Sequence, residues 1–374
     1  MAEPKQTGAS VMLAAGGTGG HLFPAFALAE ELARRGIAVD LVTDMRGDRY
    51  GSGFPARKVY QVPSATLGGK SPIAAARTAL TLARGVKAAS QVLAEVKPAV
   101  VVGFGGYPTF PPLIAARLKG IPTMLHEQNA VLGRANRMLG KRVTAIATSF
   151  EQTRLLDGAM AAKARFTGNP VRDVVIEWSA QPYRPPGFSD TFNLLVFGGS
   201  QGARYFSETV PPALQLLSAE KRRRLHVIQQ CRAEDQAQVE AIYRSASPDG
   251  PITCDVAPFF KKLPEIMASA HLVIARAGAS SVAELAVMGR PSILVPLPHA
   301  LDNDQLQNAT RLAESGASWC IEQKSLTAER LSGEISRLMA VPDALSAAAA
   351  AAKLQGRPDA VLRLADMVQG LMRR

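Results

Sequence analysis

Cysteine and long apolar runs are both scarce in this chain of 374 residues. Its three cysteines, Cys231, Cys254 and Cys320, lie far apart, and no C-x-x-C pair occurs. This spacing argues against a disulfide framework or a structural zinc site and is typical of a reducing cytosol. No apolar stretch approaches the ~20 residues of a membrane-spanning helix, and the alanine-rich run at 344–352 predicts an ordinary helix. The polar start of the sequence, with Glu3, does not predict a signal peptide.

Aromatic residues are also few, at 6% of the sequence, and acidic residues are scarce in the first half. So few aromatic side chains leave little for base stacking, and no nucleic-acid-binding motif occurs, so we expect no nucleic-acid partner. Residues 1–170 contain 21 Lys and Arg against 10 Asp and Glu, whereas the rest contains 22 against 21. The basic first half favours an anionic partner such as a membrane surface, although solubility alone also explains positive charge.

Three glycine-rich turns each follow a short apolar run. They read GGTGGH at 16–21, GFGGY at 103–107 and GGSQGA at 198–203, and the first and third lead into helix-like stretches. A buried strand, a glycine turn and a helix N-terminus together form a site for phosphate or diphosphate. Glycine lets N–H groups approach the anion, and the helix dipole favours negative charge. The sequence therefore predicts a two-domain protein that handles a phosphorylated substrate between its domains.

Strand and helix patterns alternate along both halves of the chain. Such alternation predicts two doubly wound α/β domains with parallel sheets, which bind ligands beyond the carboxyl ends of their strands. The stretch 182–189, rich in proline and polar residues, suits a connection between domains. We expect strands at 11–15, 39–43, 99–102, 123–125, 143–147, 193–197, 226–229, 272–275 and 292–295, and helices at 24–35, 73–96, 112–119, 205–217, 234–245 and 281–288.

The first turn has an alternative interpretation as part of a nicotinamide-dinucleotide site. The fingerprint G-x-G-x-x-G is matched at Gly17 and Gly19, but Leu22 occupies the third glycine position. Asp40 or Asp44, at the end of the next predicted strand, would then bind the ribose. Because this alternative leaves the other two glycine turns unexplained, we do not favour it.

Four polar residues near predicted strand ends have both functional and structural interpretations. His21 is either a general base or a polar residue bonded to nearby backbone. Ser281 and Glu284 fit the S-x-x-E capping box, but a carboxylate at a helix start also suits sugar hydroxyls. Arg276, at the end of an apolar strand, either anchors a phosphate or pairs with a carboxylate.

Asp302 and Asp304 form a D-x-D pair, which holds a divalent metal in some sugar-nucleotide enzymes. A three-letter match is common by chance, and helix ends that hold a diphosphate reduce the need for a metal. We therefore expect neither a metal nor a cofactor.

Taken in order, the motifs resemble those of the MurG family of bacterial cell-wall enzymes. This family comprises N-acetylglucosaminyltransferases that convert lipid I to lipid II. The resemblance spans nearly the whole chain and is specific as an ordered set, although each motif alone is not. It rests on GGTGGHLFP (16–24), GFGGY (103–107), HEQN (126–129), TGNPVR (167–172), GGSQGA (198–203), RAGA (276–279) with Glu284, and then Gln305 and Asn308.

The resemblance implies the GT-B architecture, two Rossmann-like domains with a cleft between them. Residues 1–170 would form the acceptor- and membrane-facing domain, residues 171–356 the UDP-N-acetylglucosamine-binding domain, and a helix near 357–374 would pack back on the first. Ser200 and Arg172 would contact the diphosphate, Phe260 the uracil through its backbone, and Glu284 the ribose. The full set of implied donor contacts is Thr18, Gly19, Gly20, Asn129, Arg172, Ser200, Phe260, Ala279, Ser280, Ser281, Val282, Ala283, Glu284 and Gln305. The segment 299–304 departs from the family's usual spacing, which makes the sugar contact at Gln305 less certain.

The implied reaction is an inverting transfer of N-acetylglucosamine to a lipid-linked muramyl pentapeptide at the cytoplasmic face of the bacterial inner membrane. His21 is the candidate base, and Gly17, Gly105, Gly106 and Tyr107 are candidates for binding the acceptor's diphosphate. Residues 72–96 form a basic amphipathic segment, with apolar residues interspersed with Arg and Lys. This segment and the residues before it predict a peripheral membrane face at Lys70, Ile73, Arg77 and Leu80. Two other classes stay open: a UDP-sugar epimerase of the same architecture, and a non-catalytic nucleotide- or nucleic-acid-binding protein.

Overall fold

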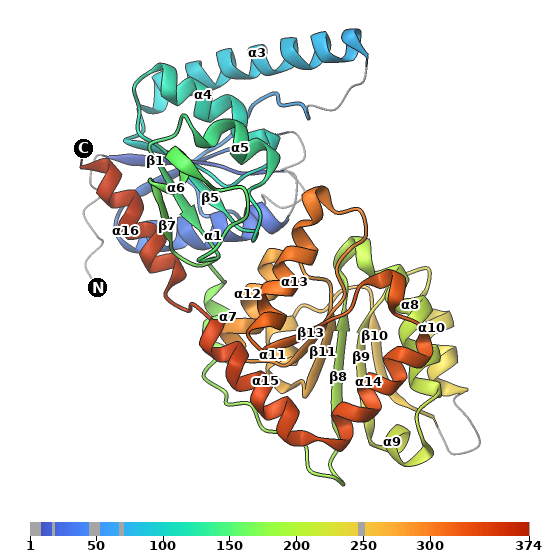
Figure 1. Cartoon of the computed structure of the whole chain (residues 1–374). Helices are drawn as coiled ribbons and strands as arrows, with labels where there is room; N and C mark the ends of the chain where they lie inside the picture. The colour runs from blue at the N-terminus through green and yellow to red at the C-terminus, as the bar shows by residue number, and fades with distance from the viewer. Residues whose placement is uncertain (1–8, 17–18, 45–52, 67–70, 246–250, 374) are drawn as a thin grey trace. The chain divides into compact units, whose positions relative to one another are not determined.

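The computed structural model of the chain describes residues 9–16, 19–44, 53–66, 71–245 and 251–373, apart from the side chains of Pro72, Ser200, Gln201 and Leu301 (Figure 1). The chain forms two compact units. Residues 1–172 and 357–374 make up the N-terminal domain, and residues 173–356 make up the C-terminal domain. Each domain is an α/β unit built on a parallel sheet.

The N-terminal sheet is parallel throughout, with strand order β3-β2-β1-β4-β5-β6-β7. β1 and β4 are buried along their whole length, which explains their unbroken apolar sequences. Ala14 pairs with Gly103, so the first two glycine turns leave neighbouring strands at the same edge. The strands are β1 (Ser10–Ala14), β2 (Ala38–Thr43), β3 (Val59–Gln61), β4 (Val100–Gly103), β5 (Thr123–Glu127), β6 (Ala145–Thr148) and β7 (Ala164–Phe166).

Helices pack on both faces of this sheet because successive strand residues point to opposite sides. Val11 and Leu13 of β1 enter a core shared with α1 and α16. Met12, between them, enters a second core that is shared with α3, α4 and α5. The helices are α1 (Gly19–Arg34), α3 (Pro72–Val96), η1 (Tyr107–Thr109), α4 (Phe110–Leu118), α5 (Arg134–Gly140), α6 (Gly158–Ala161) and α16 (Ala360–Met372).

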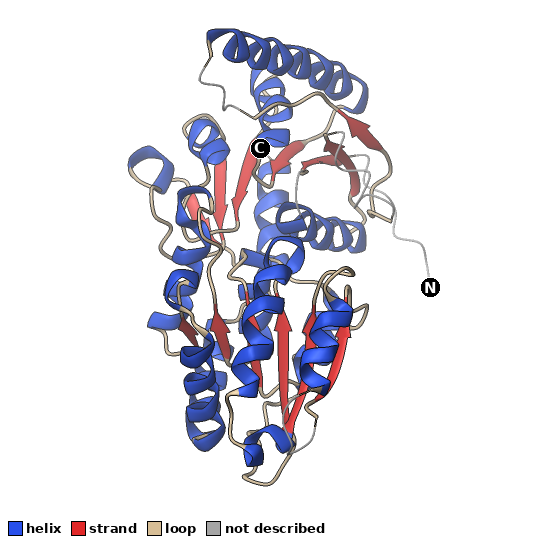
Figure 2. Cartoon of the chain, turned by 90° about the vertical axis from the view of Figure 1, so that its right-hand side faces the viewer, coloured by secondary structure: helices blue, strands red, loops and turns tan. Residues whose placement is uncertain are grey.

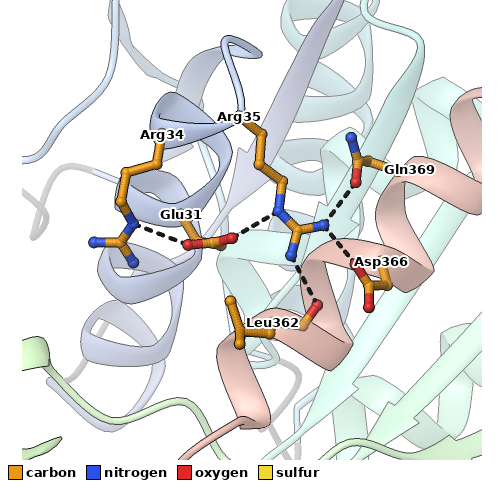
Figure 3. Close-up of polar contacts among 6 residues, drawn as sticks. All are labelled: Glu31, Arg34, Arg35, Leu362, Asp366 and Gln369. Carbon is orange, nitrogen blue, oxygen red and sulfur yellow. Dashed lines mark hydrogen bonds and ion pairs between the residues drawn. The ribbon is translucent and has the colours of Figure 1, made fainter.

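The helix α16 belongs to the N-terminal domain although it follows the C-terminal domain in sequence. Leu364 and Val368 are fully buried in the core beside α1. Figure 3 shows how Arg35, at the end of α1, links the two helices. Its guanidinium lies 2.6 Å from Glu31 and 2.6 Å from Asp366, and it also donates to side-chain and backbone oxygens of α16.

The C-terminal sheet is also parallel, with strand order β10-β9-β8-β11-β12-β13. Figure 2 shows the strands of the chain in red and the helices beside them in blue. Its strands are β8 (Phe192–Phe197), β9 (Leu225–Gln230), β10 (Thr253–Ala257), β11 (Leu272–Ala275), β12 (Ser292–Leu294) and β13 (Ser318–Cys320). The helices are α7 (Asp173–Trp178), α8 (Gly199–Gln215), α9 (Ala219–Arg224), α10 (Gln236–Arg244), α11 (Leu263–Ser269), α12 (Ala279–Met288), η2 (Leu301–Asn303), α13 (Asp304–Glu314), η3 (Gln323–Ser325), α14 (Ala328–Ala340) and α15 (Pro342–Gln355).

The proline-rich stretch 182–189 lies inside the C-terminal domain, so its assignment as an interdomain connection was wrong. Tyr183 donates its hydroxyl to the carbonyl of His271 at 2.9 Å. The fully buried Arg290 lies 5.6 Å from the Tyr183 ring and donates to the carbonyl of Gln181. These contacts attach the stretch to its own sheet. The two units instead divide after residue 172 and after residue 356.

The helices after the first and third turns begin earlier than their apolar periodicity indicates. α1 begins at Gly19 rather than at residue 24, and α8 begins at Gly199 rather than at residue 205. Periodicity detects only the part of a helix that packs on the core, so glycine-rich first turns escape it. Pro24 therefore lies within α1, not at its start. The turn glycines are part of the helix N-termini, where unpaired N–H groups collect.

α3 carries the basic amphipathic segment and lies over α4, with its N-terminal part extending beyond that helix (Figure 1). Ile73 and Leu80 are 68% and 53% exposed, and Arg77 is exposed beside them. A groove of about 490 Å³ between α3 and the end of α4 is lined by Lys87, among others, and by Leu118, which is 76% exposed. Lys70 lies outside the described residues. Within the described part of the chain, none of the helices is long and apolar enough to span a bilayer.

Candidate active site

The first and second turns meet at the carboxyl edge of the N-terminal sheet, as parallel pairing of β1 and β4 requires. Phe104 donates its N–H to the carbonyl of Ala14 at 2.9 Å, which holds the two exits together. A Cβ at Gly16 would lie 2.9 Å from Thr43 and 3.1 Å from Asp44, so β2 also closes on the first turn. Of the candidates in this turn, Gly17 and Thr18 lie outside the described residues, while Gly19 and Gly20 begin α1.

His21 lies in the first turn of α1, and the second glycine turn lies against its ring. A Cβ at Gly105 would be 3.2 Å from His21 Cε1, and one at Gly106 would be 3.3 Å from His21 Cδ2. Both glycines have positive φ, +88° and +72°, which other residues rarely adopt. The turn therefore needs glycine both for its backbone shape and for the space that the imidazole takes. Tyr107 follows at the start of η1.

Burial and neighbouring oxygens set the protonation of His21. Burial lowers the pKa of His21 below its usual 6.5, and hydrogen bonds with Gln128 and with the Phe104 backbone oppose that shift. The bond to Gln128 joins His21 Nδ1 to Oε1 over 3.1 Å. Because desolvation is the larger cause, the imidazole is neutral at pH 7, which is the form that a general base requires.

Glu127 holds the loop that follows β5 and so places Asn129. Its carboxylate accepts the N–H of Asn129 at 2.9 Å, that of Gly133 at 2.8 Å, and the amide groups of Asn129 and Asn136 at 3.3 and 2.8 Å. Burial raises the pKa of Glu127, and these four donors oppose the rise. Each donor faces an oxygen lone pair, so the ionised form is the one that this loop is built around.

Arg172 ends the first segment of the N-terminal domain. Its guanidinium carbon lies 5.5 Å from the centre of the Phe23 ring, two residues beyond His21 on α1. A Cβ at Gly19 would lie 3.0 Å from the same ring, so Phe23 fills the space beside the first turn. The implied diphosphate contact of Arg172 therefore belongs to the same edge of the N-terminal sheet as His21.

The acidic residues of the nicotinamide alternative are arranged differently from what that alternative requires. Asp40, with a side chain that is 1% exposed, accepts Nε and NH2 of Arg57 at 3.2 and 2.6 Å. This two-point ion pair leaves it unavailable to a ribose. Asp44 is buried beside Gly16.

In the C-terminal domain, the third turn is packed too closely for any side chain at two of its glycines. A Cβ at Gly198 would lie 2.5 Å from the backbone of Gly202, and a Cβ at Gly202 would lie 2.6 Å from Arg276 Cγ. Gly199, with φ +60°, has open space beside it. Ser200 forms part of the first turn of α8, but its side chain lies outside what the structure describes.

Arg276 is buried, and among the described residues it pairs with no carboxylate, so that interpretation was wrong. Its other interpretation, as a phosphate anchor, stays a prediction. Arg276 is 6% exposed and donates NH1 to the carbonyls of Val295 and Pro296 at 3.0 and 3.1 Å. NH2 donates to Gln323 Oε1 at 2.6 Å. Its guanidinium carbon also lies 5.1 Å from the ring centres of Tyr205 and of the residue that follows it. Arg276 therefore fixes the exit of β12 against α8.

Gln230 connects the third turn to the loop that carries Phe260. At the end of β9, its Oε1 accepts the N–H of Gly199 at 3.1 Å, and its Nε2 donates to the carbonyl of Pro258 at 3.2 Å. Phe260, half-buried, follows Pro258 by two residues. One amide thus sets the distance between the implied diphosphate and uracil contacts.

α12 begins with Gly278 as its N-cap, at the carboxyl end of β11. Ser281 is therefore the third residue of the helix rather than its cap, so the capping-box interpretation of Ser281 and Glu284 was wrong. Glu284 is 8% exposed within the helix. A Cβ at Gly278 would meet nothing within 4 Å, which leaves the N–H groups at this helix start approachable. The other candidates of this helix are Ala279, Ser280, Val282 and Ala283.

Gln305 and Asn308 of α13 are oriented by backbone groups. Gln305 Oε1 accepts the N–H of Leu297 at 3.0 Å, so the implied sugar contact would use its amide nitrogen. Asn308, fully buried, donates to the carbonyl of Ala277 at 3.1 Å and so ties α13 to the start of α12.

Asp302 and Asp304 do not form part of a metal cluster among the described residues. Asp304 Oδ1 accepts the N–H of Gln305 at 2.7 Å, and Asp302 has a left-handed backbone with φ +55°. Within the described residues, no group of three or more His, Cys, Asp or Glu side chains is placed to hold a metal ion.

Gln128, Glu127 and Gln230 were not predicted as site residues. Gln128 and Glu127 appeared only as letters of a motif, although Glu127 ends β5 and Gln128 follows it, at the edge of a sheet where ligands bind. That position was the available signal. For Gln230 the signal was weaker, since a polar residue that ends a strand is common.

Comparison with known protein families assigns both halves of the chain to one family. Residues 11–148 match the glycosyltransferase family 28 N-terminal domain, and residues 193–364 match the glycosyltransferase family 28 C-terminal domain.

Individual relatives narrow this assignment. The chain is 51% identical, over 97% of its length and 96% of the relative's, to the UDP-N-acetylglucosamine–N-acetylmuramyl-(pentapeptide) pyrophosphoryl-undecaprenol N-acetylglucosamine transferase of Chelativorans sp. (strain BNC1). It is 53% identical, over 96% and 95%, to the transferase of the same name from Methylobacterium sp. (strain 4-46). The crystal structure of Acinetobacter baumannii MurG is 30% identical and covers 97% of this chain and 99% of its own, with a TM-score of 0.80.

A UDP-N-acetylglucosamine 2-epimerase structure from Listeria monocytogenes, described as putative, shares the fold alone. It is 14% identical, covers 97% of this chain and 96% of its own, and has a TM-score of 0.69. The motif order, the two parallel-sheet domains and the identity to full-length transferases agree, and this chain therefore belongs to the MurG family of glycosyltransferases.

Proposed function

We propose that this chain is an inverting glycosyltransferase that moves N-acetylglucosamine from UDP-N-acetylglucosamine to the lipid-linked muramyl pentapeptide, converting lipid I to lipid II in peptidoglycan synthesis. The observation that carries this proposal is the 51–53% identity, over nearly the whole chain, to transferases named for that reaction. The epimerase alternative has only a fold likeness at 14% identity.

The C-terminal domain holds the donor. The open N-termini of α8 and α12 suit the diphosphate, because backbone N–H groups and the helix dipole both favour an anion there. The buried carboxylate of Glu284 suits the ribose hydroxyls, the loop at Phe260 suits the uracil, and the amide of Gln305 suits the sugar. Arg172 and the start of α8 at Ser200 would neutralise charge that develops on the departing diphosphate.

The N-terminal domain supplies the base. A hydroxyl of the muramyl sugar attacks the anomeric carbon, a new carbon–oxygen bond forms, and the bond from that carbon to the diphosphate breaks, so UDP leaves. The neutral ring of His21 takes the hydroxyl proton. The turn at Gly105, Gly106 and Tyr107, with Gly17, is our candidate for the acceptor's diphosphate.

Membrane contact follows from the lipid acceptor and from the surface of α3. Ile73 and Leu80 expose large apolar side chains next to Arg77, and the N-terminal half of the sequence is strongly basic. Such a helix face suits the interface of an anionic bilayer. We therefore infer that the protein binds the cytoplasmic face of the inner membrane, and Lys70, which precedes α3 in the sequence, stays a candidate for this contact.

A single turnover assay tests the activity. Purified protein is incubated with labelled UDP-N-acetylglucosamine and a lipid I analogue, and the products are separated by chromatography. We expect a lipid-linked disaccharide and free UDP in equal amounts. An epimerised sugar nucleotide would instead support the epimerase, and binding without any product would support a non-catalytic nucleotide-binding protein.

Liposome sedimentation tests the membrane contact separately. We expect binding to anionic vesicles at low salt and much weaker binding at high salt, because each Lys or Arg near the surface contributes about 1 kcal/mol that salt screens. The double variant Lys70→Glu with Arg77→Glu should bind less than a control with Lys261→Glu and Lys262→Glu in the C-terminal domain. Equal binding to neutral and anionic vesicles would contradict this surface assignment.

A further inference from the structure

The hydrogen bond between His21 Nδ1 and Gln128 belongs to a continuous series that ends on the backbone carbonyls of Gly168 and His126, and the Phe104 backbone is a further hydrogen-bond partner of the His21 ring. His126 Nε2 lies 3.2 Å from the carbonyl oxygen of Gly168, and Gln128 Nε2 lies 3.0 Å from the carbonyl oxygen of His126. A carbonyl oxygen only accepts hydrogen bonds. His126 is therefore protonated on Nε2, and the amide nitrogen of Gln128, not its oxygen, faces the carbonyl of His126. These two contacts fix the tautomer of His126 and the orientation of the Gln128 amide.

These two anchors determine the direction of every other bond in the series. Burial lowers the pKa of His126 to about 4, so its ring is neutral with the proton on Nε2. Its Nδ1 is then an acceptor, and Gln128 Nε2 donates to it at 2.9 Å. With its nitrogen facing His126, Gln128 presents Oε1 to Nδ1 of His21 at 3.1 Å. Since that oxygen only accepts, His21 Nδ1 must carry a proton.

The reversed arrangement brings acceptors together. If Gln128 were turned over, its Oε1 would face the carbonyl oxygen of His126 at about the distance of the present hydrogen bond. His126 would then have to donate from Nδ1, and the lone pair on its Nε2 would face the carbonyl of Gly168. Ser149, whose hydroxyl lies 3.4 Å from that nitrogen, relieves only part of this cost. Two buried acceptor–acceptor contacts replace two hydrogen bonds, so the series has one stable direction.

We propose that Gln128 is a positioning residue that fixes neutral His21 with its proton on Nδ1 and leaves Nε2 as the atom that accepts the proton of the attacking hydroxyl. This inference rests on the function proposed above, in which His21 is the base. When the hydroxyl proton moves to Nε2, the ring becomes an imidazolium whose Nδ1–H still donates to Gln128 Oε1. The glycines at 105 and 106 lie against the same ring and limit its rotation.

A glutamine in this place has a different effect from the aspartate of a hydrolase triad. An amide oxygen orients the ring as a carboxylate does, but it carries no charge that would hold the imidazolium in the resting state. The side chain thus selects the tautomer while burial keeps the base unprotonated.

The tautomer is measured directly, without substrates, by nitrogen NMR of the full-length protein labelled at histidine. The chain has five histidines, and the His21→Ala variant assigns the signal of interest. We expect the neutral ring of His21 to show a protonated Nδ1 and an unprotonated Nε2. A ring that is protonated on Nε2 instead would overturn the proposal, whatever the outcome of the transfer assay.

Three substitutions then test the cause. Gln128→Met keeps the length of the side chain but removes both polar atoms, and should leave His21 as a mixture of tautomers. We expect kcat to fall by about tenfold to a hundredfold, with the donor KM within about threefold. His126→Phe keeps the backbone carbonyl at 126, so one anchor of Gln128 persists and the tautomer should change less. Gln229→Met, at a buried glutamine of the C-terminal domain, controls for the loss of a buried amide.

Unchanged tautomer signals in folded Gln128→Met protein would contradict the positioning role. A changed tautomer with unchanged kcat would also overturn the proposal, because the free Nε2 would then have no part in turnover. Neither result touches the transferase activity itself, which the product assay measures in the unsubstituted protein.

Discussion

In the N-terminal domain the glycines of the second turn lie against an imidazole, whereas in the C-terminal domain a glycine of the third turn makes room for a guanidinium. Both arrangements lie at the carboxyl edge of a parallel sheet, and in each a glutamine side chain hydrogen-bonds two different segments of the chain. The difference is in the group that is held. His21 is titratable and is our proposed base, whereas Arg276 donates NH1 and NH2 to two carbonyls and an amide oxygen.

Glycine turns at the carboxyl edges of the two parallel sheets therefore support two kinds of site, one around a titratable side chain and one around helix N-termini. In the proposed mechanism, the contacts in the N-terminal domain orient His21, a group that would change its protonation state during the reaction. In the C-terminal domain they fix helix N-termini and loops, whose dipoles and N–H groups need no titration to bind a diphosphate. If this division is correct, substitutions in the two domains should affect different kinetic constants.

The largest effect is expected at His21. Removing the base should lower kcat by about 10²–10⁴, the usual contribution of general acid–base catalysis, with UDP affinity nearly unchanged. Steady-state kinetics and calorimetric UDP binding measure the two quantities. His226→Ala, at a partly exposed histidine of the C-terminal domain, is the matched control. A near-normal kcat in folded His21→Ala protein would exclude His21 as the general base.

Substitution of Glu284 should have the opposite effect to substitution of His21, with a change in the donor KM rather than in kcat. A charged hydrogen bond to ribose contributes roughly 1.5–3 kcal/mol, so Glu284→Gln should raise the donor KM about tenfold or more and leave kcat within a few-fold. Glu334→Gln, on helix α14, is the control, since the Glu334 carboxylate forms an ion pair with Arg337 of the same helix. A large fall in kcat at constant KM would contradict the expectation that the C-terminal domain affects donor binding rather than turnover.

A pair of glycine substitutions in the C-terminal domain separates stability from binding. Gly202→Ala would place a Cβ 2.6 Å from Arg276, so we expect the free energy of unfolding to fall by about 1–3 kcal/mol. Gly278→Ala meets no atom within 4 Å and should change stability by less than about 0.5 kcal/mol, but raise the donor KM.

Tryptophan fluorescence during urea unfolding reports on this domain selectively, because both tryptophans of the chain, Trp178 and Trp319, lie in it. Equal stability of the two variants would show that Arg276 does not depend on the space at Gly202.

The pH profile of kcat/KM should reflect the titration of His21 in the N-terminal domain and of no group in the C-terminal domain. Burial lowers the pKa of His21 below 6.5, so the neutral base persists as the pH falls to 6.5, and kcat/KM should decline only below that value. The titratable neighbours have depressed or raised pKa values of their own: about 4 for His126, and above its usual range for Glu127. An acid limb that begins above pH 6.5 would contradict a desolvated His21. The residual activity of His21→Ala should lack the limb.

The smallest effect is expected on removal of divalent metal. Asp304 already accepts the N–H of Gln305, so we expect UDP binding measured by calorimetry to be the same with and without EDTA. The Asp304→Asn variant should match the unsubstituted protein. A large loss with EDTA that Asp304→Asn reproduces would establish a D-x-D metal site.

The alternation of strands and helices was predictable because buried parallel strands such as β1 and β4 are unbroken apolar runs. The short edge strands β3 and β10 were not, since they are three and five residues long and partly exposed, and their sequences carry little apolar signal. Glycine turns located the sheet edges that carry the candidate site. They could not show that Gly202 leaves space for Arg276, or that Gly105 leaves space for His21, because such contacts depend on side chains that are distant in the sequence.

The shared core of α1 and α16 has a consequence for how the protein is made. Leu364 and Val368 pack with Val11 and Leu13, more than 300 residues earlier in the sequence. During translation, the N-terminal domain emerges first but cannot close this core until residues 360–372 have left the ribosome. The C-terminal domain is contiguous and can fold before then. Until then the side of the first sheet that faces α16 lacks the residues that cover it in the folded domain, and its apolar side chains are exposed to aggregation.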